Sequence, residues 1–242
     1  TAASVTGYVD LEHWELDDYS YSSGVFGGLH NNHYQSFSEE LRLASHFDGP
    51  LNFQAGLYYQ DVQQQFDAYQ YAFNLGLFIG PDPATGNAYD YNKDHHLDTT
   101  VYSVFLALYW DLNERTEITI GARYTDESKD GFIKIPYVHA GAAMFGFGAP
   151  PLIDGLEFAD DDISPEVAIN YYLTDDISVY GTYKQAFKSG GIDNSALPTA
   201  ALNPLSDTFD GFGFLVYESE DAEGFEIGMK GNFLDGAMRL NA

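Results

Sequence analysis

The sequence contains no cysteine and few basic residues, and both shortages exclude whole classes of protein. Without cysteine the chain can form no disulfide framework, no thiolate metal site and no cysteine nucleophile. Ten lysine and arginine residues stand against 37 aspartate and glutamate residues, which gives a net charge of −27. Because a nucleic-acid binder needs clustered cations for the phosphates, this composition excludes that class. It also disfavours docking on an anionic membrane surface.

Long hydrophobic runs are missing as well. No stretch approaches the run of about 18 consecutive apolar residues that marks a transmembrane helix. A transmembrane barrel stays open, because its strands never form such a run. Residues 1–7 contain no initiator methionine, basic segment or apolar signal segment, so we expect this sequence to belong to a longer protein.

Aromatic residues and glycine are abundant, and they favour strands and turns. The chain has 19 tyrosines, 18 phenylalanines and 24 glycines, and 45% of its residues are hydrophobic. Aromatic side chains are enriched in strands and glycine in turns, whereas a disordered acidic tail would contain far fewer apolar residues. The composition therefore predicts a folded, strand-rich chain.

Apolar and polar residues alternate along the chain with the period of two that strands require. Between residues 117 and 125, for example, Ile118, Ile120 and Tyr124 fall on one side, and Thr119 and Arg123 on the other. The pattern predicts strands at residues 3–18, 34–45, 51–67, 99–110, 116–128, 161–173, 177–189 and 221–233, with a ninth strand beginning at Ala237. The connections alternate in length, and the long ones are predicted at residues 19–33, 68–98, 129–160 and 190–220. All long loops are therefore expected at one end of the sheet.

A soluble β-sandwich also alternates oily and polar residues, but strand length and aromatic placement favour a membrane barrel. The predicted strands are longer than the usual strand length in soluble sheets, which is about 5 or 6 residues. Tyr59, Trp110, Tyr124 and Tyr171 lie toward strand ends, where an interfacial girdle would need them. A spanning sheet cannot leave an unpaired edge in hydrocarbon. Either the first and eighth strands close a small barrel, or further strands exist outside residues 1–242; the alternation that stops at Ala242 favours the second.

Five segments in order resemble barrel motifs of the TonB-dependent outer-membrane receptors, and together they cover most of the chain from residue 34 onward. The segments are SEELRLAS at 38–45, LNFQAGLYY at 51–59, GARYTD at 121–126, YKQAFKSGG at 183–191 and EGFEIGMKGNFLDG at 223–236. The resemblance implies an all-β fold, a transmembrane antiparallel barrel of 22 strands that is occluded by an N-terminal plug. About 8 or 9 of those strands would lie in this chain.

The resemblance also implies a function. Receptors of this kind import scarce nutrients through the outer membrane of Gram-negative bacteria, using energy that the inner-membrane TonB–ExbB–ExbD complex supplies. Residues 1–242 are expected to be a partial barrel domain, because they contain no plug, no TonB box and no closing C-terminal strand. The expected role is capture of a bulky solute by outer loops and its passage through the lumen, without catalysis. The expected partners are outer-membrane lipid, the TonB complex through the plug, and a small-molecule or metal-chelate substrate such as a ferric siderophore.

Charged residues on the polar side of the strands are expected to line the lumen. The predicted polar wall consists of Glu40, Arg42, Arg123, Lys184, Lys188 and Glu226, with Glu166 and Lys230 on the same side. They have two interpretations. They form a surface that faces a plug and guides solute, or they form an ion-pair lattice that gives each charged group of a water-filled interior a partner. On the lipid side each basic residue would cost about 2 to 4 kcal/mol at the midplane, so either interpretation supports the same register.

The predicted long loops contain patches of apolar and aromatic residues. Exposed apolar clusters often mark recognition sites, here for a hydrophobic or aromatic ligand, although large loops also need small cores of their own. The candidate ligand-binding residues are Tyr69, Tyr71, Phe78, Phe145, Phe147, Phe212 and Phe214.

Metal and catalytic motifs are weak. Residues 90–101 begin like a calcium loop, but His95 replaces the required glycine and Val101 the required glutamate. His30, His33 and the pair His95–His96 are interpreted as solvated loop histidines. No metal site and no cofactor is expected, apart from a weakly held calcium ion on the outer loops, and no Gly-x-Ser-x-Gly nucleophile elbow occurs.

Two functions from other classes stay open. A passive porin would share the strands and loops but would need neither a plug nor a TonB box. A secreted acidic β-sandwich that binds or hydrolyses carbohydrate would be soluble without detergent and would pack its oily residues into a dry centre.

Overall fold

The computed structural model describes residues 1–18, 27–71, 74–144, 152–193, 215–234 and 237–242, and nearly all of this part is antiparallel strand. The strands are β1 (Ala2–Asp18), β2 (Gly27–Ala44), β3 (Leu51–Tyr71), β4 (Tyr91–Asn113), β5 (Thr116–Val138), β6 (Leu152–Thr174), β7 (Ile177–Lys188), β8 (Gly191–Ile192), β9 (Val216–Tyr217), β10 (Glu220–Phe233) and β11 (Met238–Asn241). Two four-residue helices, α1 (Leu75–Phe78) and α2 (Ala140–Ala143), lie in the connections. None of the described helices has the length and apolarity that a membrane crossing requires.

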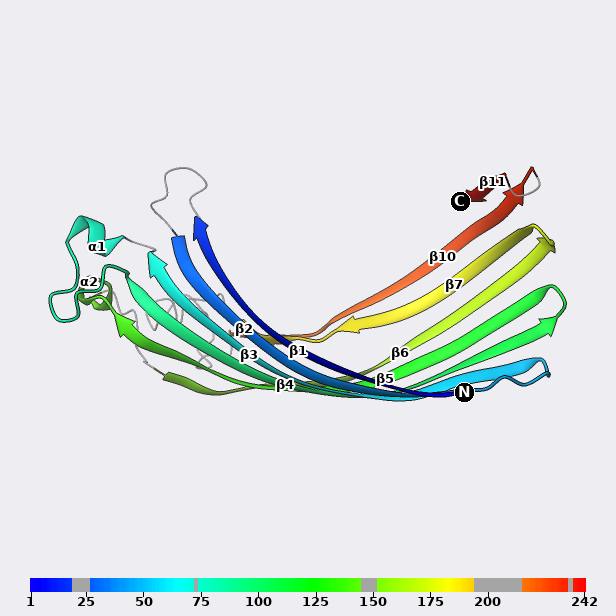
Figure 1. Ribbon diagram of the computed structural model, residues 1–242, viewed down its shortest axis with the longest axis horizontal. Helices are drawn as coiled ribbons and strands as arrows, with labels where there is room; N and C mark the ends of the chain where they lie inside the picture. The colour runs from blue at the N-terminus through cyan, green and yellow to red at the C-terminus, as the bar shows by residue number, and fades with distance from the viewer. Residues whose placement is uncertain (19–26, 72–73, 145–151, 194–214, 235–236) are drawn as a thin grey trace, which may run out of the picture.

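Nine of the strands form one sheet in the order β1-β2-β3-β4-β5-β6-β7-β10-β11, and β8 and β9 form a separate ribbon. Figure 1 shows the nine strands side by side in a strongly curved sheet, with the short connections on the right and α1 and α2 at the opposite end. Consecutive strands are neighbours, and every pairing is antiparallel. The predicted alternation of short and long connections is therefore confirmed.

One face of the sheet carries an apolar belt that is exposed rather than packed. Directly opposed residues of neighbouring strands share a face, and Leu57, Val104 and Tyr124 follow one another across β3, β4 and β5. Leu106, Ile120 and Ile169 on this face are each 47% exposed, and Ile227 is 87% exposed. Oily rows that point outward in this way do not form a dry centre, so the soluble sandwich interpretation is wrong.

The belt has a defined border toward the end with the long connections. A row of aromatic side chains forms this border: Tyr8, Phe37, Tyr59, Tyr102 and Tyr124. The ring centroids of Tyr59 and Tyr102, which are neighbours in the row, lie 5.2 Å apart. Aspartates follow on the same face one pleat further along, at Asp10, Asp61, Asp126 and Asp161. From Leu51 to Tyr59 a strand tilted by 45° rises about 19 Å, which covers most of the apolar band, about 25 Å tall, of an outer-membrane barrel.

One carboxylate lies within the belt, on β2. Glu39 shares the face of Leu41 and Tyr59, beside an apolar groove of about 440 Å³. Ser4 donates a hydrogen bond of 2.5 Å to one oxygen of Glu39, and Thr6 donates to the other. The two hydroxyls of β1 thus satisfy a charge that the period-two pattern did not predict on this face.

The strand boundaries predicted at the long-loop end are wrong, because the strands continue far past the belt. β2 begins at Gly27, β4 at Tyr91 and β6 at Leu152, and β5 continues to Val138, so much of the four predicted long connections is strand. In these extensions backbone pairs such as Asp98–Asp130 continue the ladder. Apolar and polar residues are mixed on the face that carries His95 and Ile133, and both of these residues are buried, so the sequence shows no regular alternation although the backbone hydrogen bonds continue.

The nine-stranded sheet is open. In the described residues β1 pairs only with β2, and β11 pairs only with β10. Closure of a small barrel by the first and eighth strands is therefore wrong, and the chain forms part of a barrel wall.

Candidate functional site

All six residues of the predicted polar wall lie on the face opposite the apolar belt. Glu40 is opposite Tyr58 on this face, Arg123 is opposite Ser164, and Lys184 is opposite Glu166. Arg42, Lys188 and Glu226 follow in the same rows of β2, β7 and β10. The strand register thus places all six on one face, as the period-two pattern predicts, and that this face lines the lumen stays a prediction.

Each of these six side chains has a polar or charged partner. Arg42 pairs with Glu40, Lys184 lies 2.9 Å from Glu166, and Lys188 lies 3.9 Å from Glu220. The hydroxyl of Tyr180 donates to Glu226, and Arg123 donates to Ser103 at 3.0 Å while its guanidinium lies between the rings of Tyr58 and Phe105, at 5.2 and 5.9 Å. These contacts are separate pairs, and both interpretations of the wall, an ion-pair lattice and a surface that guides solute, stay predictions.

Because Lys184 and Glu166 are largely solvated, we expect their ion pair to contribute little to stability. Replacing Lys184 with methionine should change the free energy of unfolding by less than about 1 kcal/mol. Thermal unfolding of the purified protein in detergent checks this, with Lys188→Met as the matched control at a wider ion pair. A loss of several kcal/mol for K184M alone would show that the pair is buried in the assembled barrel.

The structure describes three of the seven aromatic residues predicted to bind ligand. Tyr69 and Tyr71, at the end of β3, contact Tyr89 with ring centroids 5.3 and 6.4 Å apart, and Tyr89 contacts Tyr137 at 5.0 Å. Phe78, in α1, is 68% exposed. The other four candidates, Phe145, Phe147, Phe212 and Phe214, lie outside the described residues. Tyr69 and Tyr71 therefore help to form a small core in the connection, and Phe78 is the described candidate with an open surface.

Buried polar residues tie this connection to the start of α2. Asp82 accepts hydrogen bonds from the backbone N–H groups of Ala84 at 2.8 Å and Ala140 at 3.2 Å, and the Nε2 atom of His139 lies 3.2 Å from the carbonyl of Gly80. The N–H of Ala84, with those of Ala140 and Thr85, lowers the pKa of Asp82 despite the burial that opposes it. Sequence reasoning missed this role, although the segment Pro81–Gly86 has the composition of turns.

The β8–β9 ribbon packs on the polar face near the long-loop end. Ile192 of β8 and Leu215 form a cluster with Ile133, Ile153 and Leu156 of β5 and β6, and Leu97 and Val216 pack against it. Lys129 fixes the approach to the ribbon: its ammonium donates to the hydroxyl of Ser189 at 3.0 Å and to the carbonyl of Gly190, and pairs with Glu127 at 2.8 Å. The ribbon thus covers part of the polar face with a dry core.

Two basic side chains are buried beside this core. Burial lowers the pKa of Lys93 to about 8, and the nearby carboxylate of Asp193 partly opposes that shift. Burial, together with the charges of Lys93 and His96, lowers the pKa of His95 to about 4. The two ring nitrogens of His95 have no hydrogen-bond partner among the described residues. The interpretation of His95 as a solvated loop histidine is therefore wrong.

Comparison with protein families decides what this sheet belongs to. A family model described as TonB dependent receptor-like, beta-barrel, matches residues 2–242. The chain belongs to the TonB-dependent receptor family. In outer-membrane barrels the longer connections lie outside the cell. We therefore use the name outer mouth for the end of this sheet that carries the long connections, the β8–β9 ribbon and the Tyr89 cluster.

Solved receptor structures share this fold. The ferric yersiniabactin uptake receptor FyuA from Yersinia pestis has a TM-score of 0.67 and 17% identity over 97% of this chain and 31% of the receptor. The siderophore receptor PiuA from Acinetobacter baumannii has a TM-score of 0.60 and 16% identity over 99% of this chain and 36% of the receptor. The copper transporter OprC has a TM-score of 0.59 and 14% identity over 96% of this chain and 33% of the transporter. The chain thus spans about a third of these receptors. Among curated proteins no sequence matches it.

We expect the buried His95 to make the outer mouth of this TonB-dependent receptor segment sensitive to acid. The unfolded chain protonates His95 near its ordinary pKa of 6.5, whereas the folded chain does so only near pH 4. The stability that His95 contributes is therefore full above the unfolded pKa and is lost as the pH falls toward 4, by up to about 3 kcal/mol.

Comparing thermal unfolding at about pH 7 and about pH 4.5 tests this dependence. His95→Leu should remove the largest single part of the loss, whereas H46L, in an exposed short turn, should retain the wild-type dependence. Equal acid sensitivity in the two variants would contradict the burial of neutral His95.

Proposed function

We propose that this chain forms part of the wall of an outer-membrane, TonB-dependent receptor that imports a scarce, bulky solute. The observation that carries the proposal is the division of the sheet into two faces, an exposed apolar belt with an aromatic border and a polar face whose charges are paired. Lipid requires the first face and a watery interior requires the second. The outer membrane of a Gram-negative bacterium is the proposed location.

For the solute we infer a ferric siderophore or another metal chelate. The similar structures include the uptake receptor FyuA for ferric yersiniabactin, the ferric citrate transporter FecA and the copper transporter OprC. In this chain, the exposed ring of Phe78 at the outer mouth suits contact with the aromatic or hydrophobic part of such a chelate. An anionic chelate would also need cations from outside this acidic segment, because its Arg42 and Lys184 are paired.

The proposed mechanism is transport without chemical change. Outer loops capture the solute, the TonB–ExbB–ExbD complex acts through a plug that this segment does not contain, and the solute then passes along the polar face. No bond is made or broken in the cargo, so the receptor is proposed not to be an enzyme. The paired charges keep the polar face hydrated, and they present no charged group without a partner to the cargo.

Uptake measurements in the native host test the proposal. Deleting the gene should abolish uptake of one radioactive iron chelate under iron limitation, and the plasmid-borne gene should restore it. Uptake should also stop in a strain without TonB. If every chelate tested enters the deletion strain at the wild-type rate, the proposed substrate class is wrong. If the complemented strain imports a solute without TonB, the segment belongs to a passive channel.

A further inference from the structure

On the polar face of β1 and β2, beyond the membrane belt, two carboxylates and a buried histidine converge. Glu15 and Asp17 are two residues apart on β1 and share one face, and His30 of β2 lies directly opposite Glu15. The Nδ1 atom of His30 is 3.0 Å from Asp17 Oδ2 and 3.5 Å from Glu15 Oε1, and these three atoms all lie within 4.8 Å of one another. We propose that this triad binds a divalent transition-metal ion at the outer mouth.

The separations suit a single bound ion. Zinc bonds to histidine nitrogen and carboxylate oxygen are about 2.0 to 2.2 Å long, so neighbouring ligand atoms around one ion lie about 3.0 to 3.5 Å apart. His30 already lies at those separations from both carboxylates. A small movement of the two carboxylates toward each other completes the three-ligand set.

Burial and a further hydrogen bond fix the orientation of His30. Only 6% of its side chain is exposed, its ring lies 5.0 Å from that of Phe66, and the amide of Gln70 is 3.0 Å from its Nε2 atom. When Nδ1 holds a metal, Nε2 carries the proton and needs an acceptor; the side-chain oxygen of Gln70, in the flipped amide orientation, fills that role. The Gln70 amide thus acts as an outer support that holds the imidazole toward the carboxylates.

The charge balance also favours a cation. In the described part of the chain, no lysine or arginine pairs with Glu15 or Asp17, and their ion-pair partners are the histidines His13 and His30. His13 lies on the same face of β1, with its Nε2 atom 3.3 Å from the second oxygen of Glu15, but it is outside the three-ligand set. Imidazole and carboxylate together suit Zn²⁺, Ni²⁺ and Cu²⁺, whereas Mg²⁺ prefers oxygen alone.

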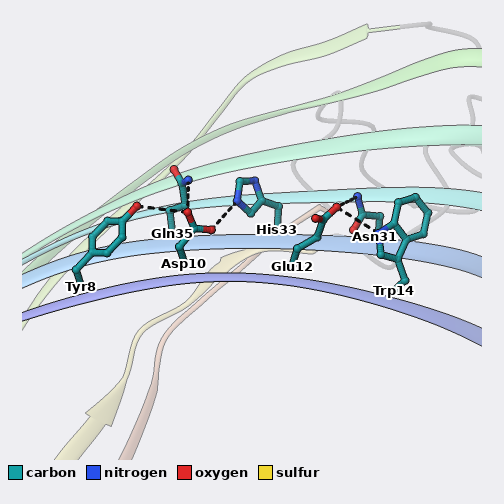
Figure 2. A network of polar contacts seen from close by, with 7 residues as sticks. All are labelled: Tyr8, Asp10, Glu12, Trp14, Asn31, His33 and Gln35. Atoms are coloured by element: carbon teal, nitrogen blue, oxygen red, sulfur yellow. Dashed lines mark hydrogen bonds and ion pairs between the residues drawn. The ribbon is translucent and has the colours of Figure 1, made fainter.

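A matched histidine–carboxylate pair lies on the opposite face of the same two strands. Figure 2 shows Asp10 reaching His33 and Gln35, and Glu12 reaching Asn31 and Trp14. The Nε2 atom of His33 is 3.0 Å from Asp10, as close as His30 is to Asp17, but its side chain is 40% exposed. In the described residues no second carboxylate joins His33 to form a three-ligand set. His33 is therefore the natural control.

Titration of the intact receptor with Zn²⁺ and with Cu²⁺ tests the site. The natural protein, in detergent and freed of metal by chelation, should bind one high-affinity equivalent, and the Cu²⁺ paramagnetic resonance spectrum should show coupling to nitrogen. His30→Ala should weaken binding at least 100-fold, and Gln70→Leu about 10-fold through the lost outer support. His33→Ala should leave the affinity unchanged.

The double variant E15Q/D17N keeps the side-chain shapes, so it tests the site even if the His30→Ala variant misfolds. It should lose the high-affinity equivalent while retaining the cooperative thermal unfolding of the natural protein. Equal affinity in the His30→Ala and His33→Ala variants, or wild-type affinity in the double variant, would overturn the proposal. So would a natural receptor that binds neither ion. These titrations involve no uptake, so their failure is distinguishable from failure of the transport function.

Discussion

Replacing Ile120 with arginine should prevent normal assembly of the barrel in the outer membrane. Ile120 lies in the apolar belt opposite Leu108 and Val167. A basic side chain on the lipid face near the midplane costs about 2 to 4 kcal/mol, a large share of the stability of an ordinary domain. The expected result is a sharp drop in the amount of folded receptor, measured from its heat-resistant migration in gels of outer-membrane fractions.

The neighbouring residue supplies the control. Thr119 lies on the polar face, opposite Ala168, so Thr119→Arg extends into the watery interior of the barrel. We expect the T119R variant to assemble at close to the natural level. Equal loss for both substitutions would show that the two faces are not distinguished by lipid, and that would contradict the register described above.

Replacing Ile133 with alanine should detach the β8–β9 ribbon from the barrel wall. Ile133 is fully buried and lies at the centre of the cluster formed with Ile192 and Leu215. Removing a buried isoleucine side chain costs about 2 to 5 kcal/mol, because it takes away apolar contact and leaves a cavity. Since this core joins the ribbon to β5 and β6, we expect much of the cost to appear as local opening.

Hydrogen exchange measures that opening. Amides of β8 and β9 should exchange at least about 30-fold faster in I133A, while those of β3 and β4 within the belt keep their rates. Leu152, at the same end of β6, is 44% exposed, and Leu152→Ala should leave ribbon exchange nearly unchanged. If I133A speeds exchange throughout the sheet, the ribbon is part of the barrel's global folding unit.

The sequence was sufficient to predict the fold wherever each face of a strand meets a different medium. In β7 and β10, apolar residues alternate with polar ones, and the predicted bounds lie within one residue of Ile177–Lys188 and Glu220–Phe233. In the outer halves of β4 and β5 the two faces no longer divide into an apolar and a polar one, because the β8–β9 ribbon covers the side of Ile133, and cross-strand pairs such as Thr99–Lys129 carry no alternation. Backbone pairing alone extends those strands, and a period-two pattern does not detect it.

The candidate site was less predictable because it depends on contacts between distant segments. The polar wall follows from alternation, so Arg123 and Lys184 were placed on the correct face. His95 is buried opposite Ile133, whose cluster includes Leu215 far along the chain, and the position of His30 depends on its register with Glu15. Neither pairing leaves a local signal, and histidines in polar segments are commonly solvated. The structure corrects that interpretation for both.

The central claim is that the apolar rows of this sheet face lipid and the polar rows face water. This chain has no cysteine, so once any cysteine elsewhere in the receptor is replaced, single cysteines at positions 103–108 of β4 can each carry a nitroxide label in the receptor reconstituted into bilayers. We expect labels at Val104, Leu106 and Leu108 to be relaxed most by dissolved oxygen, and labels at Ser103, Phe105 and Ala107 most by a water-soluble nickel chelate. Accessibility that is uniform along the segment, or alternates in the opposite phase, would contradict the account.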